Sequence, residues 1–387
     1  MLEDSPGVDN LRVLFVLWQG RPGGAELHTA RLAAELHRRG HDVRVLTIAG
    51  GEAVPAELAP AGVPFASLDA DRGRGVLLRA GKLRHAVSWL DPHVVVLPSN
   101  GILSIVFRAQ PYGGVLLAAE HGRVLNRFLM SPRQAALDWL ARLVAARLVD
   151  GEVAVSEVAR EGLRRLPHSR VMWVIHNGVD CGAFAPPRCT VRDDARIRVG
   201  IAARLVDGKG VDGVIRALGT LGRDGLLSRH TTLLSIAGDG PRRAAFESAA
   251  QSLPDGVHVR FLGHVKDMPA FWRDQDIGVF ASDRLNESFG LAGVEAASCG
   301  CRLVMLPSAA ATEVFEGCPG LHIAAAQPDG LPRAIEAAMH DGPPTYSERV
   351  ATHEWTRKRY SLSKTASAYE AFFRTLVEAK RYRHEHG

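Results

Sequence analysis

Two glutamates at a fixed spacing, Glu287 and Glu295, are the residues of this chain whose pattern could most clearly do chemistry. Seven residues separate them, in the run Glu-Ser-Phe-Gly-Leu-Ala-Gly-Val-Glu. The run begins as a loop and continues as a helix, and Gly290 marks the turn between them. Free backbone N–H groups and the positive end of the helix dipole would then suit an anionic ligand beside Glu287. A ligand that carries both a diphosphate and hydroxyl groups, such as a sugar nucleotide, would use the N–H groups and the carboxylates together. The alternative is a buried helix with two solvated acids.

Two basic residues, Arg204 and Lys209, stand five positions apart after another apolar run. A loop at the carboxyl end of a strand can bring both cations to one diphosphate, because arginine offers a planar fork and lysine a point charge. When a group leaves a nucleotide, negative charge accumulates on the diphosphate, so these cations would stabilise the transition state more than the ground state. The alternative is a loop with solvated charges at the start of a helix.

A histidine, His121, follows the apolar run Val115–Ala119 after Glu120. A histidine at the carboxyl end of a strand is a better catalytic candidate than one on an apolar helix face, so we expect His121 to be functional. Asn100, which follows another strand, is a weaker candidate.

Three glycine-containing turns could border the same ligand. Gly23 and Gly24 lie between a strand and a helix, where bare amides could approach a phosphate or a sugar. They do not form a GxGxxG fingerprint, so a dinucleotide site is not indicated. Gly238 lies in a strand-to-helix turn and would allow close approach, and backbone groups near Val265 could contact a nucleobase.

Strand and helix patterns alternate along the whole chain, which predicts an α/β fold with parallel sheets covered by helices on both faces. The expected strands are Leu11–Leu17, Val43–Ile48, His93–Leu97, Val115–Ala119, Glu152–Val155, Val171–Ile175, Ile197–Ala202, Thr231–Ala237, Val257–Phe261, Ile277–Phe280 and Arg302–Leu306. Pro186 and Pro187 mark a linker over Cys181–Asp194. The segment Trp355–Arg381 has the pattern of one long helix, with Tyr369, Phe372, Phe373 and Leu376 on one face.

Length and composition narrow the class of protein. A chain of 387 residues is long enough for two domains, and 46% of its residues are hydrophobic. The net charge of +5 is spread along the chain without a basic arm or stacked aromatics, so a nucleic-acid partner is not expected. The five cysteines include no CxxC pair, and the polar N-terminus is unlike a signal peptide. We expect a cytoplasmic protein without a membrane span.

With these residues in hand, the sequence resembles the retaining glycosyltransferase family 4. Glu287 and Glu295 match the family's E-x7-E element, and Arg204 and Lys209 match its R-x4-K pair. Asn177-Gly178-Val179-Asp180 matches its hinge, Gly23 and Gly24 its first glycine loop, and His121 its cleft histidine. The resemblance implies the GT-B fold, in which two doubly wound, Rossmann-like domains face each other across a cleft. It also implies an acceptor-binding domain over residues 1–180, a donor-binding domain over 181–357, and a C-terminal helix, 358–381, that crosses back to the first domain.

The resemblance also implies roles for the site residues. Arg204 and Lys209 would bind the donor's diphosphate, Glu295 the ribose hydroxyls, and Glu287 would lie near the donor sugar. His121 would orient that sugar or stabilise positive charge near its anomeric carbon. The implied catalytic residues are His121, Glu287, Arg204 and Lys209. The implied donor-binding residues are Gly23, Gly24, Arg204, Lys209, Gly238, Val265, Glu287, Ser288, Phe289, Gly290, Leu291 and Glu295.

The implied activity is hexosyl transfer from a nucleotide-diphosphate sugar to a hydroxyl or amine of a small molecule or glycan precursor, without a metal. Gly293, inside the helix, departs from the family pattern and suggests close approach by something bulky. A sugar-nucleotide 2-epimerase and a non-catalytic, sugar-nucleotide-binding subunit are alternatives.

The stretch 123–147 could also touch a membrane. It alternates basic and apolar residues, as an interfacial helix does, although a helix packed on its own sheet is the commoner case. The basic residues are Arg123, Arg127, Arg133, Arg142 and Arg147. The acceptor, the donor base and the oligomeric state stay open.

Overall fold

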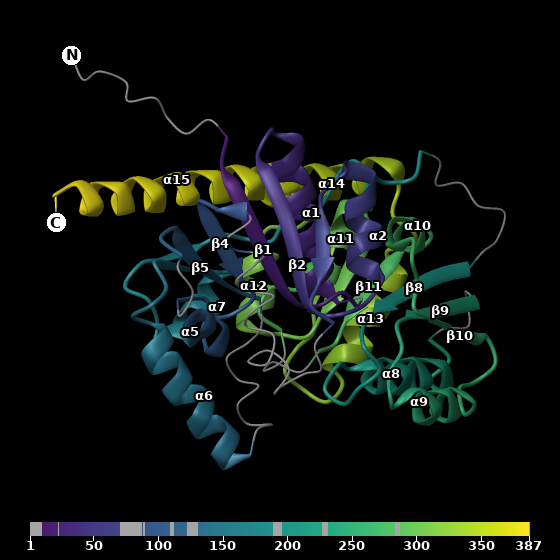
Figure 1. The fold of residues 1–387 in the computed structure, drawn as a ribbon. Helices are drawn as coiled ribbons and strands as arrows, with labels where there is room; N and C mark the ends of the chain where they lie inside the picture. The colour runs from purple at the N-terminus through teal and green to yellow at the C-terminus, as the bar shows by residue number, and fades with distance from the viewer. Residues whose placement is uncertain are drawn as a thin grey trace. The chain divides into compact units, whose positions relative to one another are not determined.

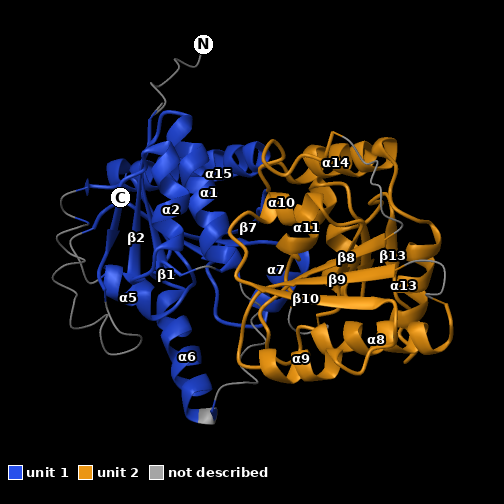
Figure 2. Ribbon diagram, turned by 90° about the vertical axis from the view of Figure 1, so that its right-hand side faces the viewer, with its two compact units in different colours: residues 1–178, 362–387 blue, residues 179–361 orange. Residues whose placement is uncertain are grey.

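The computed structural model describes residues 10–21, 23–69, 87, 90–108, 112–121, 131–188, 196–226, 231–282 and 287–386. The chain forms two compact units, one of residues 1–178 with 362–387 and the other of residues 179–361 (Figure 2).

The first unit is built on a parallel sheet of seven strands in the order β3-β2-β1-β4-β5-β6-β7. Strands β1, β2, β4 and β5 of this sheet are labelled in Figure 1. The strands are β1 (Arg12–Gln19), β2 (Asp42–Ala49), β3 (Phe65–Ser67), β4 (Val94–Leu97), β5 (Val115–Glu120), β6 (Gly151–Ala154) and β7 (Met172–Val174). The helices described in this unit are α1 (Gly24–Arg38), α2 (Ala53–Leu58), α5 (Ile102–Arg108), α6 (Pro132–Ala145), α7 (Glu157–Arg164) and α15 (Leu362–His386), with a 3₁₀ turn at Ala59–Ala61.

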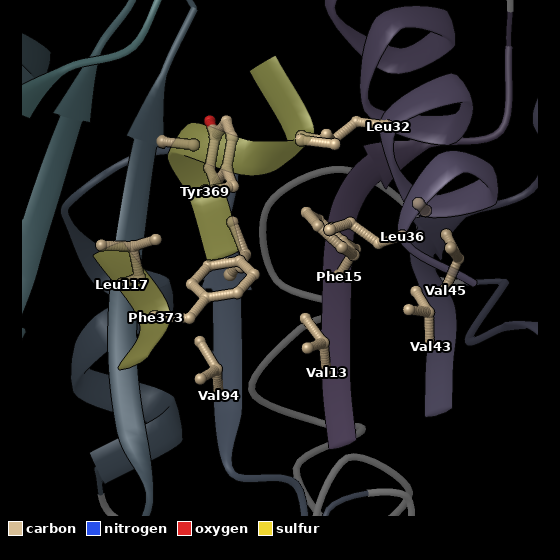
Figure 3. Packing of buried hydrophobic residues seen from close by; sticks show 14 of the residues in the cluster. Val13, Phe15, Leu32, Leu36, Val43, Val45, Val94, Leu117, Tyr369 and Phe373 are labelled. Carbon is tan, nitrogen blue, oxygen red and sulfur yellow. The ribbon is translucent and has the colours of Figure 1, made fainter. Parts of the chain in front are cut away.

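Helices bury both faces of this sheet, which explains why its central strands are almost entirely apolar. On one face, Phe15 of β1 and Leu117 of β5 share a core with Leu36 of α1 and with Tyr369 and Phe373 of α15 (Figure 3). The alternate residues of the same strands belong to a second cluster that includes Leu103 and Phe107 of α5. The C-terminal helix is therefore part of the core of the first unit.

The second unit has a parallel sheet of six strands in the order β10-β9-β8-β11-β12-β13. The strands are β8 (Arg196–Ala202), β9 (Thr231–Ala237), β10 (Val257–Gly263), β11 (Ile277–Phe280), β12 (Arg302–Met305) and β13 (Leu321–Ile323). The helices are α8 (Val211–Arg223), α9 (Arg243–Ala250), α10 (Met268–Arg273), α11 (Leu291–Ser298), α12 (Ala309–Val314), α13 (Gly330–His340) and α14 (Tyr346–Tyr360). Both sheets have the strand order of doubly wound folds, so the predicted fold class is confirmed.

The prediction of one continuous helix over Trp355–Arg381 is wrong. The structure has two helices, α14 and α15, separated at Ser361, whose backbone is extended with ψ of 141°. Ser361 forms a parallel bridge with Val179, and the Val179 N–H donates to the Tyr360 carbonyl at 2.8 Å. The break therefore comes from a long-range backbone pairing, and no proline or glycine announces it in the sequence.

The predicted linker, Cys181–Asp194, is described as far as residue 188 and has no helix or strand there; residues 189–195 lie outside the described part of the chain. None of the described helices is both long and apolar enough to cross a lipid bilayer.

Candidate functional site

In the second unit, the loops that follow β8, β9 and β10 are locked together by backbone contacts. Gly238, after β9, has a φ of 135°, and a Cβ atom there would lie 1.9 Å from the Ala203 carbonyl oxygen after β8. The Gly238 N–H in turn donates to the Gly263 carbonyl at the end of β10. Only glycine fits between the two neighbouring loops, so the predicted close approach at Gly238 is to the loop that carries Arg204 and Lys209.

Lys209 and Glu287 come together at the start of α11. The Lys209 Nζ lies 3.6 Å from a Glu287 carboxylate oxygen. The same carboxylate accepts a hydrogen bond of 3.0 Å from the N–H of Gly290, which caps the helix with a φ of 84°. A cation, a carboxylate and a helix N-terminus therefore meet at one place, although they come from loops nearly eighty residues apart in sequence.

The first turn of α11 presents further donors. The N–H groups of Leu291 and Ala292 have no hydrogen-bond partner among the residues that the structure describes. Unsatisfied N–H groups at a helix N-terminus are a ready site for a phosphate oxygen. The side chain of Phe289, by contrast, is buried and packs edge-on against Tyr360, so that side chain serves the core and only its backbone is available to a ligand.

The other predicted donor residues of this unit are spread around the same loops. Arg204 is exposed, and among the described residues the ion pair with Glu287 is made by Lys209. Val265 is partly buried in the loop after β10, and Ser288 is buried beside Glu287. The structure thus brings Lys209, Glu287 and the α11 N-terminus into contact. Arg204 and Val265 lie in the loops after β8 and β10, at the same edge of the sheet, but outside this group.

Glu295 lies at the start of the second turn of α11 and is buried, with 8% of its surface exposed. The helix sits tightly on its own unit at Gly293, where a Cβ atom would lie 2.7 Å from Phe315 and 2.8 Å from Met305. The bulky neighbour suggested by this glycine is therefore the protein's own core. Gly293 says nothing about the donor sugar.

In the first unit, His121 follows β5. It lies near Thr29 of α1 and near Asn177, next to the point where the chain leaves this unit. Its imidazole hydrogen-bonds with the Asn177 side chain. Its Nε2 lies 3.5 Å from Thr29 Oγ1, whose own proton is donated to the Ala25 carbonyl, so Nε2 is the donor in that weak contact. Burial lowers the pKa of His121 from 6.5 to about 4, because burial disfavours the charged ring. At neutral pH His121 is therefore uncharged.

A second histidine, His28 of α1, is a part of this cluster that sequence reasoning missed. It is 1% exposed and its ring centroid lies 5.6 Å from that of His121. Its Nε2 accepts a 3.0 Å hydrogen bond from the Gly178 N–H, where the chain leaves the first unit. Burial lowers the pKa of His28 well below 6.5, with the nearby His121 as a further cause. The available signal was its place on the apolar face of α1, next to Thr29 and Ala30.

Buried polar residues also support β5, the strand that His121 follows. Glu120 accepts hydrogen bonds from the Asn100 backbone N–H at 2.8 Å and from Arg142 of α6 at 3.1 Å. The Asn100 side chain donates in turn to Glu152 of β6. Asn100, the weaker of the sequence candidates, is thus a buried connector between two carboxylates.

Gly23 and Gly24 precede and begin α1. A Cβ atom at Gly23 would lie 2.3 Å from a carboxylate oxygen of Glu26, which accepts a hydrogen bond from Gln19. Gly24, by contrast, has open space around its Cα. Among the residues that the structure describes, no group of three histidine, cysteine, aspartate or glutamate side chains could hold a metal ion.

We predict that Gly238→Ala destabilises the second unit by about 2–5 kcal/mol, because alanine disfavours positive φ and its Cβ would overlap the Ala203 carbonyl. The matched control is Gly213→Ala in α8, where a Cβ meets only Leu331 at 3.7 Å. This control should be neutral or stabilising by up to about 1 kcal/mol. Thermal unfolding measures both variants, and equal midpoints would contradict the close approach at Gly238.

We predict that stability falls as the pH is lowered from 6.5 to 4. The folded chain holds His28 and His121 neutral, whereas the unfolded chain protonates them near pH 6.5. The unfolded state therefore binds more protons in this window, and the free energy of unfolding rises with pH across it. Urea titrations at pH 4–7 should show a shallower acid decline for His121→Gln than for wild type. The exposed His258→Gln is the control, and an identical decline in all three chains would disprove the assignment.

Comparison of the sequence with known protein families finds one match in each of the two units. The model of the family described as "Glycosyltransferase Family 4" matches residues 22–182, and that described as "Glycosyl transferases group 1" matches residues 190–359. A D-inositol 3-phosphate glycosyltransferase of Actinosynnema mirum is 30% identical over 323 residues, which cover 74% of this chain and 76% of that protein.

A second relative and a solved structure are also similar to this chain. A GDP-mannose-dependent α-(1-6)-phosphatidylinositol dimannoside mannosyltransferase of Mycobacterium tuberculosis is 28% identical over 377 residues, covering 90% of this chain and 93% of the relative. The crystal structure of Anabaena HepE in complex with UDP and glucose superposes with a TM-score of 0.75 at 19% identity, covering 94% of this chain and 99% of that one. The matched families, which together span both units, confirm the resemblance seen in the sequence: this chain belongs to glycosyltransferase family 4 and is a retaining, nucleotide-sugar-dependent enzyme with the GT-B fold.

Proposed function

We propose that the second unit binds the nucleotide sugar through the edge that carries Lys209, Glu287 and the α11 N-terminus. The observation that carries this proposal is the convergence of a lysine, a carboxylate and unsatisfied helix N–H groups. The diphosphate binds Lys209, Arg204 and the N–H groups of Leu291 and Ala292. Glu287 contacts the donor sugar, and Glu295 contacts the ribose hydroxyls. Gly238 and Val265 border the nucleotide.

The proposed reaction is a same-face substitution that retains the anomeric configuration. The bond from the anomeric carbon to the departing phosphate oxygen breaks, and a bond to an acceptor oxygen or nitrogen forms on the same face. The departing phosphate oxygen takes the acceptor's proton, so no enzyme nucleophile and no metal is needed. Lys209 and the helix N-terminus stabilise the charge that develops on the diphosphate.

His121 acts on the transferred sugar in this proposal. An uncharged imidazole can sit beside the positive charge that develops at the anomeric carbon, whereas an imidazolium would repel it. The lowered pKa of His121 supports this role because the ring stays neutral at the pH of the cell. Gly23 and Gly24, at the start of α1, are proposed as further donor-binding residues.

The donor sugar is proposed to be a hexose, and the acceptor a hydroxyl or amine of a small molecule or glycan precursor bound by the first unit. The names of the relatives favour an inositol-containing acceptor, since one is a phosphatidylinositol dimannoside mannosyltransferase and another a D-inositol 3-phosphate glycosyltransferase.

We predict that Lys209→Ala lowers turnover about 100-fold through lost transition-state stabilisation, whereas Glu295→Gln mainly weakens donor binding, about tenfold or more. Turnover is measured as release of nucleoside diphosphate, and donor binding by calorimetry. Arg333→Ala, an exposed cation of α13 in the same unit, is the matched control. Wild-type behaviour of both site variants would exclude the proposed donor site.

A specific observation also favours a membrane contact through α6. Leu137, Leu140 and Val144 form a stripe along one side of this helix, with exposed fractions of 67%, 54% and 44%. Arg133 in the first turn and Arg147 just beyond the helix are exposed at the two ends of the stripe. An apolar stripe with flanking cations fits the surface of an anionic bilayer.

The structure corrects one part of the sequence prediction for this stretch. Arg142 is buried against Glu120, so it faces inward and is not part of a lipid-binding face. Residues 122–130, including Arg123 and Arg127, lie outside the described residues. We propose that the outer face of α6 rests on anionic lipid while the chain works in the cytoplasm.

We predict that wild-type protein co-sediments with vesicles of anionic phospholipid and that Leu137→Glu/Leu140→Glu reduces the bound fraction at least fivefold. The loss should exceed that of Leu226→Glu, which changes a leucine of the second unit with an exposed fraction of 49%. Similar binding of both variants, or no binding of wild type, would rule out α6 as a membrane contact.

A further inference from the structure

Arg142 is a charged side chain of α6 that points into the protein and is buried there. The outer residues of this helix are largely exposed, yet the Arg142 side chain is only 11% exposed and its partner Glu120 only 6%. Their atoms Nη1 and Oε1 lie 3.1 Å apart. A buried arginine–carboxylate pair of this kind costs desolvation energy on both sides, so its presence calls for a reason other than general stability.

The pair lies at the residue next to the proposed catalytic histidine. Glu120 is the last residue of β5 and His121 follows it directly. The carboxylate of Glu120 is fixed from two sides, by Arg142 and by the Asn100 backbone N–H. The end of β5 is thereby tied to α6 and to the loop after β4, which leaves little freedom to the peptide that carries His121.

The charges around Glu120 make Arg142 indispensable to this arrangement. Glu152 is 0% exposed and is linked to Glu120 through Asn100. It also accepts a hydrogen bond from the Ser169 N–H at 2.9 Å. Burial raises the pKa of Glu152, and the nearby Glu120 raises it further. Among the described residues, Arg142 is the only cation within ion-pair distance of either carboxylate. The same guanidinium also pairs with Asp138, whose carboxylate oxygen lies 3.3 Å from the Arg142 Nε.

We propose that Arg142 is a positioning residue for His121: its buried ion pair with Glu120 fixes the end of β5, and with it the peptide that carries the catalytic imidazole. This inference rests on the proposed function of His121. Loss of Arg142 would leave Glu120 without its ion-pair partner and would raise the pKa of Glu152 further, so that the peptide at His121 could shift. A misplacement of about an ångström near the reacting atoms costs on the order of 100-fold in rate.

The test compares Arg142→Gln and Arg142→Lys with wild type by the pH dependence of kcat for release of nucleoside diphosphate. Arg142→Gln should lower kcat at least tenfold with the donor KM within twofold. Its acid limb should move to higher pH, because carboxylates without a cation protonate more easily. Arg142→Lys keeps the charge and should restore most of the wild-type pH profile. Arg164→Gln, which changes an exposed arginine of α7 that pairs with Glu161 of the same helix, is the control.

A purely structural role predicts something else. It predicts a smaller folded fraction with kcat per folded molecule and the pH profile unchanged, and that result would overturn the proposal. Should Arg142→Gln not fold, Glu120→Gln/Arg142→Met removes both charges of the ion pair together. That double variant should fold and still show the tenfold loss of kcat, and wild-type kcat in it would refute the inference.

His121→Ala, measured alongside, separates this proposal from the proposed function. If His121→Ala is as active as wild type, the role of His121 fails. If His121→Ala is inactive while Arg142→Gln is fully active with an unchanged pH profile, only the positioning role of Arg142 fails.

Discussion

The proposed donor site of the second unit depends on one backbone contact, the close packing of Gly238 against the Ala203 carbonyl. Parallel strands deliver their carboxyl ends to the same edge of a sheet, but loops with side chains would keep the backbones apart. Gly210, where a Cβ would lie 2.0 Å from the Ala281 carbonyl, has the same effect on the other side of the Lys209 loop. Confined from both sides, this loop presents Lys209 to Glu287 at the start of α11.

The surroundings of His121 in the first unit are held by polar contacts in place of close backbone packing. Two buried carboxylates, an arginine and an asparagine side chain fix the end of β5, and His28 accepts a hydrogen bond from the residue at which the chain leaves the unit. Such a network is sensitive to the loss of any member, because the remaining buried groups lose their partners. The first unit therefore keeps His121 neutral by burial and fixed by the charges behind it.

Much of the fold could be predicted from the sequence, and the donor site could be proposed from it, because both rest on local patterns. Apolar runs followed by glycine turns indicated the parallel strands, and the spacings of Arg204 with Lys209 and of Glu287 with Glu295 indicated the site. What could not be predicted depends on contacts between distant segments. The break at Ser361 comes from its pairing with Val179, the burial of Arg142 from a carboxylate twenty-two positions away, and the role of His28 from an N–H of Gly178. Gly293 was misleading because a glycine in a helix marks close approach without saying whether a ligand or the core approaches.

The account claims above all that the edge formed by Lys209, Glu287 and the α11 N-terminus binds the diphosphate of a nucleotide sugar. The most direct measurement is a thermal-shift series with UDP, dTDP, GDP, ADP and NAD, each with and without EDTA. The account predicts that one nucleoside diphosphate raises the melting temperature, that EDTA leaves the shift unchanged, and that Lys209→Ala removes most of it. Stabilisation by NAD alone, or a shift that survives in Lys209→Ala undiminished, would contradict it.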